Sequence, residues 1–233
     1  MDIMISQLPL NIQLNDIATF ENYYSTDNEA VVIHIKNMFA SHNQPFIYLW
    51  GQEGVGKTHL LQACCHFAQH LELSACYLPL GDHGQWQPEL LDNFDQFDLV
   101  CLDDIEQIAA KPTWERACFN LFNQLRAADK RLLISAKHLP QQLGLKLEDL
   151  ISRLTWGLSL RLQPLTDEAK LAALQLRAKN RGLGLSDEVA RFLLLRCPRD
   201  MQSLFATLEK LDQASLAAKR RLTIPFVKEI LRL

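Results

Sequence analysis

Eight consecutive residues have the types and spacing of a phosphate-binding loop. The apolar run FIYLW (46–50) is followed by GQEGVGKT (51–58), which fits the pattern G-x-x-x-x-G-K-[ST]. Glycines let such a loop turn its backbone N–H groups inward, and the N-terminus of the following helix adds partial positive charge. The residues expected to bind the nucleotide here are Gly51, Gly54, Val55, Gly56, Lys57, Thr58 and His59.

Within this loop, Lys57 is expected to reach the β- and γ-phosphates, and the hydroxyl of Thr58 is expected to hold Mg²⁺. The alternative is a glycine-rich turn with an exposed lysine. A second apolar run, LVCL (99–102), ends in Asp103 and Asp104. Asp103 is expected to bind Mg²⁺ through water, and Asp104 stands where a catalytic carboxylate orients the attacking water. Without the glycine loop, two such carboxylates would simply be a solvated strand end.

Short apolar runs alternate with helical patterns over the first two thirds of the chain. Alternation of this kind predicts an α/β fold with a mostly parallel five-stranded sheet flanked by helices. The first four runs are almost continuously apolar, as strands covered on both faces are, whereas the fifth alternates like an edge strand. The expected strands are 46–50, 75–80, 98–103, 131–136 and 158–162, and two intervening helices are expected at 58–71 and 113–128.

The strand signal stops after Pro164, and helical patterns follow. Thr166, Ser186 and Asp200 each precede one of three expected helices and can cap it, and Pro225 can start a short terminal helix. We therefore expect three parts: a flexible tail over 1–15, a nucleotide-binding α/β domain over 16–164, and a small all-helical domain over 165–233.

Composition excludes several classes of protein. The chain has 233 residues, a formal net charge of −3 and 48% apolar residues, which suffice for a sizeable core. With a net charge near zero, the protein as a whole does not attract DNA. Binding to nucleic acid would therefore require a local patch of Lys and Arg residues, and none stands out in the sequence. No apolar run approaches the roughly 20 residues of a membrane helix, so we expect a cytoplasmic protein without membrane contact. Six cysteines without a C-x-x-C pair predict buried reduced thiols.

Several segments together resemble the AAA+ ATPase module of the bacterial replication initiator DnaA and, more closely, the Hda family of DnaA-related regulators. They are QLPL, FIYLWGQEGVGKTHLL, LVCLDDIEQIA, SRLTWG, RFLL and LTIPFVKEIL, and they extend over nearly the whole chain. The resemblance implies an AAA+ core, a helical lid and an adenine nucleotide between them. It also implies DnaA as a partner. The chain ends where DnaA-like initiators continue into a helix-turn-helix domain, which implies that DNA is reached only indirectly.

Arg153, within SRLTWG, matches the family arginine that acts on nucleotide held by a neighbouring subunit. A guanidinium suits this role because it is always charged and can bridge two phosphate oxygens. The alternative is a surface arginine before an edge strand. Gln7, Leu8 and Leu10 resemble the short motif with which replication proteins bind the DNA polymerase III β sliding clamp. The alternative is a tail that packs on its own core.

The resemblance has two departures. Lys137 follows the strand where the family's initiators have a polar sensor residue, and Gln202 replaces the arginine that senses the γ-phosphate, with Arg199 as an uncertain substitute. A neutral amide stabilises phosphate charge less well than a guanidinium, so bound ADP is more plausible than self-catalysed hydrolysis. Phe20, Tyr23 or Tyr24, and Asn28 resemble the family's adenine-side segment, but core and capping roles fit them equally.

Two functions follow from these residues. The first is an adaptor that binds nucleotide, Mg²⁺ and the clamp, and uses Arg153 to make DnaA hydrolyse its ATP, thereby preventing re-initiation. The second is a self-sufficient AAA+ ATPase resembling a helicase loader, which uses Asp104 and an arginine from a second copy of itself. A homodimer is possible under either hypothesis.

Overall fold

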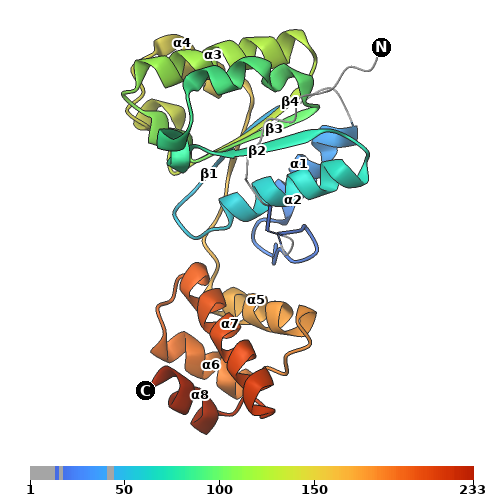
Figure 1. The fold of residues 1–233 in the computed structure, drawn as a ribbon, viewed down its shortest axis with the longest axis vertical. Helices are drawn as coiled ribbons and strands as arrows, with labels where there is room; N and C mark the ends of the chain where they lie inside the picture. The colour runs from blue at the N-terminus through green and yellow to red at the C-terminus, as the bar shows by residue number, and fades with distance from the viewer. Residues whose placement is uncertain (1–13, 16–17, 41–44) are drawn as a thin grey trace.

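A five-stranded parallel sheet forms the centre of the larger part of the molecule (Figure 1). The computed structural model describes residues 14–15, 18–40 and 45–233. Its strand order is β2-β3-β4-β1-β5, which confirms the predicted α/β class. The strands are β1 (Phe46–Trp50), β2 (Ala75–Pro79), β3 (Leu99–Asp103), β4 (Arg131–Ala136) and β5 (Leu158–Arg161).

The burial of each strand follows its sequence. Every residue of β3 is buried, because helices cover both faces of the sheet there. In β5, the outward residues Ser159 and Arg161 are exposed while Leu158 and Leu160 are half-buried, so the predicted edge strand is confirmed. Because the strands are parallel, the loops after β1, β3 and β4 emerge at one edge of the sheet, where they can contribute jointly to a site.

Two layers of helices cover the sheet (Figure 1). On one face lie α1 (Glu29–Ala40) and α2 (Lys57–His70), and on the other lie α3 (Pro112–Ala127) and α4 (Glu148–Trp156). Each face has its own apolar cluster, one around Phe94 and Phe122 and the other around Ile35 and Leu60. Short 3₁₀ helices connect the layers: η1 (Leu80–Gln85), η2 (Pro88–Gln96), η3 (Ile105–Ile108) and η4 (Pro140–Gln142).

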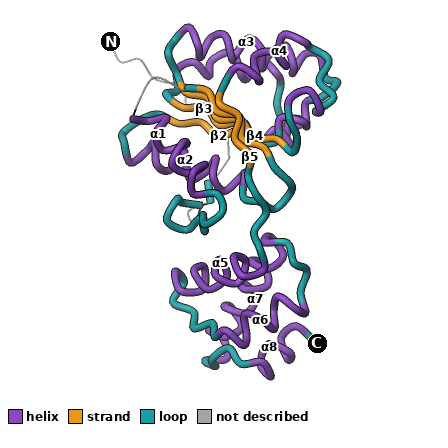
Figure 2. Tube along the Cα trace, turned by 180° about the vertical axis from the view of Figure 1, so that it is seen from behind, coloured by secondary structure: helices purple, strands orange, loops and turns teal. Residues whose placement is uncertain are grey.

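Four helices form the C-terminal part, below the sheet in both views (Figures 1 and 2). They are α5 (Asp167–Asn180), α6 (Asp187–Arg196), α7 (Met201–Ala218) and α8 (Ile224–Leu231). The predicted caps are confirmed, since the side chains of Thr166, Ser186 and Asp200 each accept a backbone N–H in the first turn. Leu174, Leu204 and neighbouring residues fill a core that is separate from the two clusters of the sheet.

Some expectations differ from the structure. Helix α1 was not predicted, because its apolar stripe is short, although Asn28, a favourable N-cap type, directly precedes it. Strand β2 ends one residue early, at Pro79, where the chain turns into η1. Five cysteines are buried free thiols, as predicted, and Cys197 is half-buried. In the described ranges, no helix is both long and apolar enough to span a bilayer. The tail residues Gln7, Leu8 and Leu10 lie outside the described residues.

Candidate nucleotide-binding site

The loop between β1 and α2 has the backbone conformation of a phosphate-binding loop. Gly54 and Gly56 have φ values of +78° and +95°, which residues with a side chain adopt only at a cost. A Cβ placed on Gly56 would stand 2.7 Å from the ring of Tyr23, whereas one on Gly54 would meet nothing within 4 Å. The space beside Gly54 is therefore open, and the absence of a side chain at Gly56 lets the ring of Tyr23 pack against the loop.

Tyr23 supports this loop. Its hydroxyl donates a hydrogen bond to the carbonyl oxygen of Val55 over 3.3 Å, and its ring centroid lies 5.4 Å from that of His59. His59 is held in turn by a 2.8 Å hydrogen bond between Nε2 and the carbonyl oxygen of Thr19. His59 lines the neighbouring cavity, whereas Tyr23 does not. Nucleotide contact by Tyr23 stays a prediction, and its observed contacts are with the loop.

Lys57 is buried at the first position of α2. Its ammonium group donates to the carbonyl oxygens of Gly51, over 2.9 Å, and Gln52, over 3.0 Å. Burial lowers the pKa of Lys57, and the nearby carboxylate of Asp104 partly opposes this effect. A phosphate entering the loop would offer this cation oxygens of full negative charge in place of neutral carbonyls.

Two hydroxyl groups fix the carboxylate of Asp103. One of its oxygens accepts a hydrogen bond from Tyr77 on β2 over 2.8 Å, and the other accepts one from Ser135 on β4. Ser135 Oγ also accepts the backbone N–H of Asp104 over 2.9 Å. Asp103 is only 3% exposed and does not line the cavity. This geometry is compatible with metal contact through water, which stays a prediction.

Asp104 faces the cavity from a left-handed backbone position with φ of +57°. Burial, followed by the negative charges of Asp103 and Glu106, raises the pKa of Asp104 to about 6. One carboxylate oxygen of Glu106 is buried without a hydrogen-bond partner among the described residues. Carboxylates in this arrangement fit a nearby divalent cation, because positive charge would relieve their mutual repulsion.

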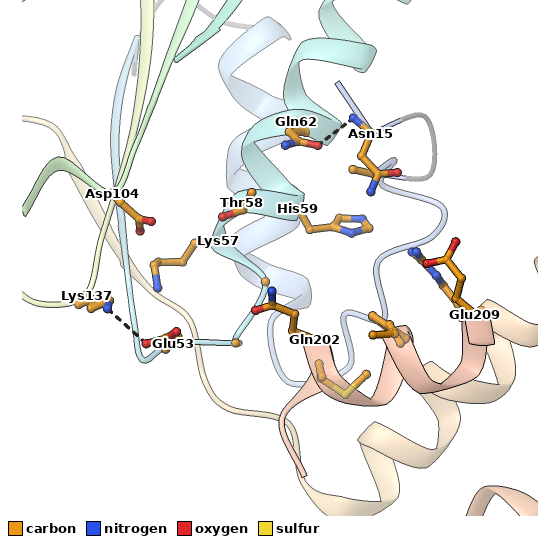
Figure 3. Close-up of a pocket in the computed structure, with 17 residues that line it drawn as sticks. Asn15, Glu53, Lys57, Thr58, His59, Gln62, Asp104, Lys137, Gln202 and Glu209 are labelled. Carbon is orange, nitrogen blue, oxygen red and sulfur yellow. Dashed lines mark hydrogen bonds and ion pairs between the residues drawn. The ribbon is translucent and has the colours of Figure 1, made fainter. Parts of the chain in front are cut away.

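A cavity of about 570 Å³ lies between the loop and the lid helices (Figure 3). Lys57, Thr58 and Asp104 lie on one side of it, and Gln202 and Glu209 of α7 on the other. No three His, Cys, Asp or Glu side chains in the described ranges form a metal-binding group. The hydroxyl of Thr58, the carboxylate of Asp104 and the oxygens of a bound phosphate have chemistry that suits Mg²⁺.

Three basic side chains differ in their partners and in whether they line the cavity. Lys137 lines it and forms an ion pair with Glu53 over 3.2 Å. Arg199, the suggested substitute for the missing arginine, pairs instead with Asp167 over 3.3 Å and does not line the cavity. Arg177 of α5 does line it, with its guanidinium 4.7 Å from the ring centroid of Phe205.

The residues resembling an adenine-side segment have structural contacts. Phe20 is buried, with its ring centroid 5.6 Å from that of Phe67. The buried side chain of Asn28 accepts the backbone N–H of Gln163 over 2.8 Å and donates to the carbonyl oxygen of the same residue over 3.0 Å. Tyr24 packs against the lid core. The observed contacts of Phe20 and Asn28 are with other segments of the chain, and nucleotide contact by these two residues stays a prediction.

Arg153 lies away from the cavity, in the last turn of α4. Its guanidinium stands 5.9 Å from the ring centroid of Phe119 and 6.0 Å from that of Phe122. It lines a small hollow together with Phe46, the first residue of β1. Because the phosphate-binding loop follows the last residue of β1, Arg153 and that loop lie at opposite ends of the strand.

The sequence reasoning missed several residues of this region. Ser135 and Tyr77, which hold Asp103, occupy strands on either side of β3, and the polar residue near the end of an otherwise apolar β4 was a usable signal. Helical periodicity would have extended the cavity face of α7 beyond Gln202. That face also contains Met201, Phe205, Ala206 and Glu209. No local sequence signal distinguishes Arg177 from the other lid arginines.

Two family models match the chain. The model described as Hda, lid domain, matches residues 167–231, and the model of the bacterial DnaA ATPase domain matches residues 84–161. Neither match includes the phosphate-binding loop.

Solved structures with the same fold are found among DnaA proteins and motors. Domain III of DnaA from Thermotoga maritima matches with a TM-score of 0.81 and 21% identity, over 95% of this chain and 98% of that chain. AMPPCP-bound DnaA from Aquifex aeolicus matches with a TM-score of 0.73 and 24% identity, over 85% and 66% of the two chains. The RuvB branch migration motor of T. maritima matches with a TM-score of 0.66 and 16% identity, over 92% and 73%.

These solved structures establish the fold, and the two family models show to which proteins the matched segments are related. The ATPase-domain match lies within the sheet part, and the lid match spans α5 to α8. Residues 84–161 are therefore related to the bacterial DnaA ATPase domain and residues 167–231 to the Hda lid, and the fold is that of DnaA domain III.

Proposed function

We propose that this chain is a replication regulator that binds ADP and Mg²⁺ in its own cavity and makes DnaA hydrolyse ATP. In this proposal, Arg153 acts on the nucleotide held by DnaA, and Gln7, Leu8 and Leu10 bind the β sliding clamp. The observation that carries the proposal is the position of Arg153 at the end of β1 opposite the phosphate-binding loop.

The length of β1 supports action on a neighbouring molecule. Five extended residues separate the α-carbons of Phe46 and Trp50 by about 13 Å. Arg153 is held at the Phe46 end by its contacts with Phe119 and Phe122. A guanidinium in this position is poorly placed for the chain's own nucleotide but can meet phosphates presented by another subunit.

The cavity supports nucleotide binding without efficient turnover. The loop, Lys57, Thr58 and Asp104 supply phosphate- and metal-binding chemistry. Gln202 presents a neutral amide from the lid, so this position contributes no positive charge to a transition state. The AMPPCP bound to DnaA of A. aeolicus supports an adenine nucleotide as the ligand class.

One observation favours the alternative of a self-sufficient ATPase. Asp104 lines the cavity and is close enough to Lys57 for each charge to affect the other's pKa. A carboxylate in that place can orient a water molecule towards a γ-phosphate. This second function predicts rapid ATP hydrolysis by the isolated protein, which Lys57→Ala would abolish.

The two functions are separated by measuring hydrolysis of ATP bound to DnaA in the presence of DNA-loaded clamp. We expect Arg153→Ala to slow stimulated hydrolysis by about 10³-fold or more, because arginine fingers contribute this much to the rate. Arg161→Ala, which removes an exposed arginine from neighbouring β5, is the matched control and should change the rate less than about twofold. Full stimulation by the Arg153→Ala protein would refute the proposed role of this residue.

A further inference from the structure

Charge is distributed unevenly along this chain. Residues 165–233 contain 13 Lys and Arg residues against 8 Asp and Glu residues, whereas residues 1–164 contain 11 against 19. The helical lid therefore has a formal net charge of +5 and the remainder −8, although the whole chain is close to neutral. Such asymmetry between two parts of a chain points to a polyanionic partner for the basic part.

Five of the 13 cations of the lid lie between the residue after α7 and the residue after α8. Five exposed basic side chains and one carboxylate, Glu229, lie within residues 219–232. We call these five residues the lid basic corner: Lys219, Arg220, Arg221, Lys228 and Arg232.

Packing contacts hold the two helices of the corner together. The guanidinium of Arg220 stands 4.5 Å from the ring centroid of Phe226 and pairs with Glu229 over 3.1 Å. The hydroxyl of Ser215 donates to the carbonyl oxygen of Arg220 over 2.6 Å. Arg220 is thus partly neutralised and has a structural role, while it fixes the chain on either side of it.

Within the described ranges, the other four cations have no carboxylate partner, although the ammonium group of Lys228 stands 5.7 Å from the ring centroid of Phe192. Among the described residues, no carboxylate lies within ion-pair distance of Lys219, Arg221, Lys228 or Arg232. Cations near helix C-termini compensate the helix dipole, which accounts for single residues at the ends of α7 and α8. Dipole compensation does not explain Arg221, which lies between the two helices. It also does not explain four cations without a carboxylate partner within residues 219–232.

The corner is separate from the nucleotide-side cavity. The cavity uses the first half of α7, up to Glu209, and the corner begins after the last residue of the same helix. The ten residue steps from Glu209 to Lys219 correspond to about 15 Å along the helix axis. Helix α8 also lies on the side of the lid away from the sheet (Figures 1 and 2), so a ligand there need not cover the cavity.

We propose that the lid basic corner binds the phosphate backbone of duplex DNA. Backbone binding needs only cations that replace condensed counterions, and these residues supply them. A protein partner or a single strand would favour aromatic side chains, for contact area or for base stacking. Among the described residues, Trp156 on α4 is the exposed large aromatic side chain, and the exposed large apolar side chains of the lid are the aliphatic Leu195, Leu216 and Leu233.

The test uses the full chain and a labelled duplex of about 30 base pairs, without clamp or DnaA, followed by fluorescence anisotropy from about 50 to about 200 mM salt. Four neutralised phosphates predict that affinity falls roughly 10²-fold over this range. The variant Arg221→Gln/Lys228→Gln/Arg232→Asn should weaken binding at the lower salt concentration by at least about tenfold and reduce the log–log salt slope by about 2.7. Asparagine is used at position 232 because the backbone there is left-handed, with φ of +56°.

A charge-matched variant separates the corner from net charge. Lys146→Gln/Lys179→Gln/Lys210→Gln removes three exposed cations elsewhere and should lower affinity less than about threefold. Unchanged circular dichroism and ADP affinity would show that both variants fold. Equal losses in the two variants, no duplex binding by the unmodified protein at the lower salt, or equal affinity for polyglutamate would overturn the proposal. Because clamp and DnaA are absent, none of these results depends on the proposed regulatory function.

Discussion

The two ends of β1 show two different ways of building a functional site. At its carboxyl end, the site is made largely of backbone, with two glycines at positive φ and a buried lysine folded against loop carbonyls. At its amino end, a single arginine side chain rests on aromatic rings. The loop at the carboxyl end has the chemistry to bind a phosphate group by itself. Arg153 at the amino end has no phosphate to contact unless another molecule presents one.

The charges at the two ends differ. Asp103, Asp104 and Glu106 gather at the carboxyl end, where their repulsion contributes to the raised pKa of Asp104. At the amino end, the guanidinium of Arg126 stands 4.4 Å from the ring centroid of Trp156 in α4, and at the same edge of the sheet Lys130 pairs with Asp98 over 2.8 Å.

Gly56→Ala should weaken ligand binding at the carboxyl-end site severely. The added methyl group would collide with Tyr23, and the residue would have to adopt a left-handed conformation. Strain of about 1–3 kcal/mol at a binding loop predicts a loss of ADP affinity of about 10- to 100-fold. Isothermal titration calorimetry measures it.

Gly54→Ala is the internal control for this variant. It has the same left-handed strain but open space around the new methyl group, so its loss should be clearly smaller. Equal losses would mean that the contact with Tyr23 does not shape the loop.

Ser135→Ala tests how much the hydroxyl groups around Asp103 contribute to the stability of the fold. It removes the donor to one carboxylate oxygen and the acceptor for the N–H of Asp104, all in a buried region. Loss of these bonds predicts a decrease of about 2 kcal/mol in the free energy of unfolding, measured by urea denaturation. Ser159→Ala, on the exposed side of β5, should change it by less than about 0.5 kcal/mol. Similar values for the two serines would contradict the account of this carboxylate cluster.

Asp104→Asn should give a smaller, pH-dependent effect. Because the pKa of Asp104 rises from 3.8 to about 6 on folding, ionisation penalises the folded state above pH 6, and the penalty disappears as the pH falls below 4. The group is only partly buried, so solvent screening reduces the expected gain from the substitution to about 1 kcal/mol at pH 8. Denaturation at pH 8 and pH 4 measures it. Equal stabilisation at both pH values would rule out the ionisation of Asp104 as its cause.

The sequence predicted the parts of this molecule that depend on local pattern. Five strands, the phosphate-binding loop and three lid caps follow from apolar periodicity and residue types at fixed spacing. Gln202 lines the cavity and Arg153 lies away from it, and the roles that the family resemblance implies for them stay predictions.

Contacts between distant segments could not be predicted in the same way. Tyr77 and Ser135 meet Asp103 only because β2 and β4 flank β3 in the sheet. Asn28 meets Gln163 across 135 positions of the chain, and Arg199 turns to Asp167 on another helix. Such pairings depend on how the elements pack, and single-sequence patterns contain little information about packing.

The central claim is that the carboxyl end of β1 binds the chain's own nucleotide and the amino end does not. It is tested most directly by titrating ADP and Mg²⁺ into the purified, nucleotide-stripped protein by calorimetry. The account predicts one ADP per chain, a loss of at least about 100-fold in affinity in Lys57→Ala, and an unchanged affinity in Arg153→Ala. A comparable loss in Arg153→Ala, or undiminished binding in Lys57→Ala, would contradict it.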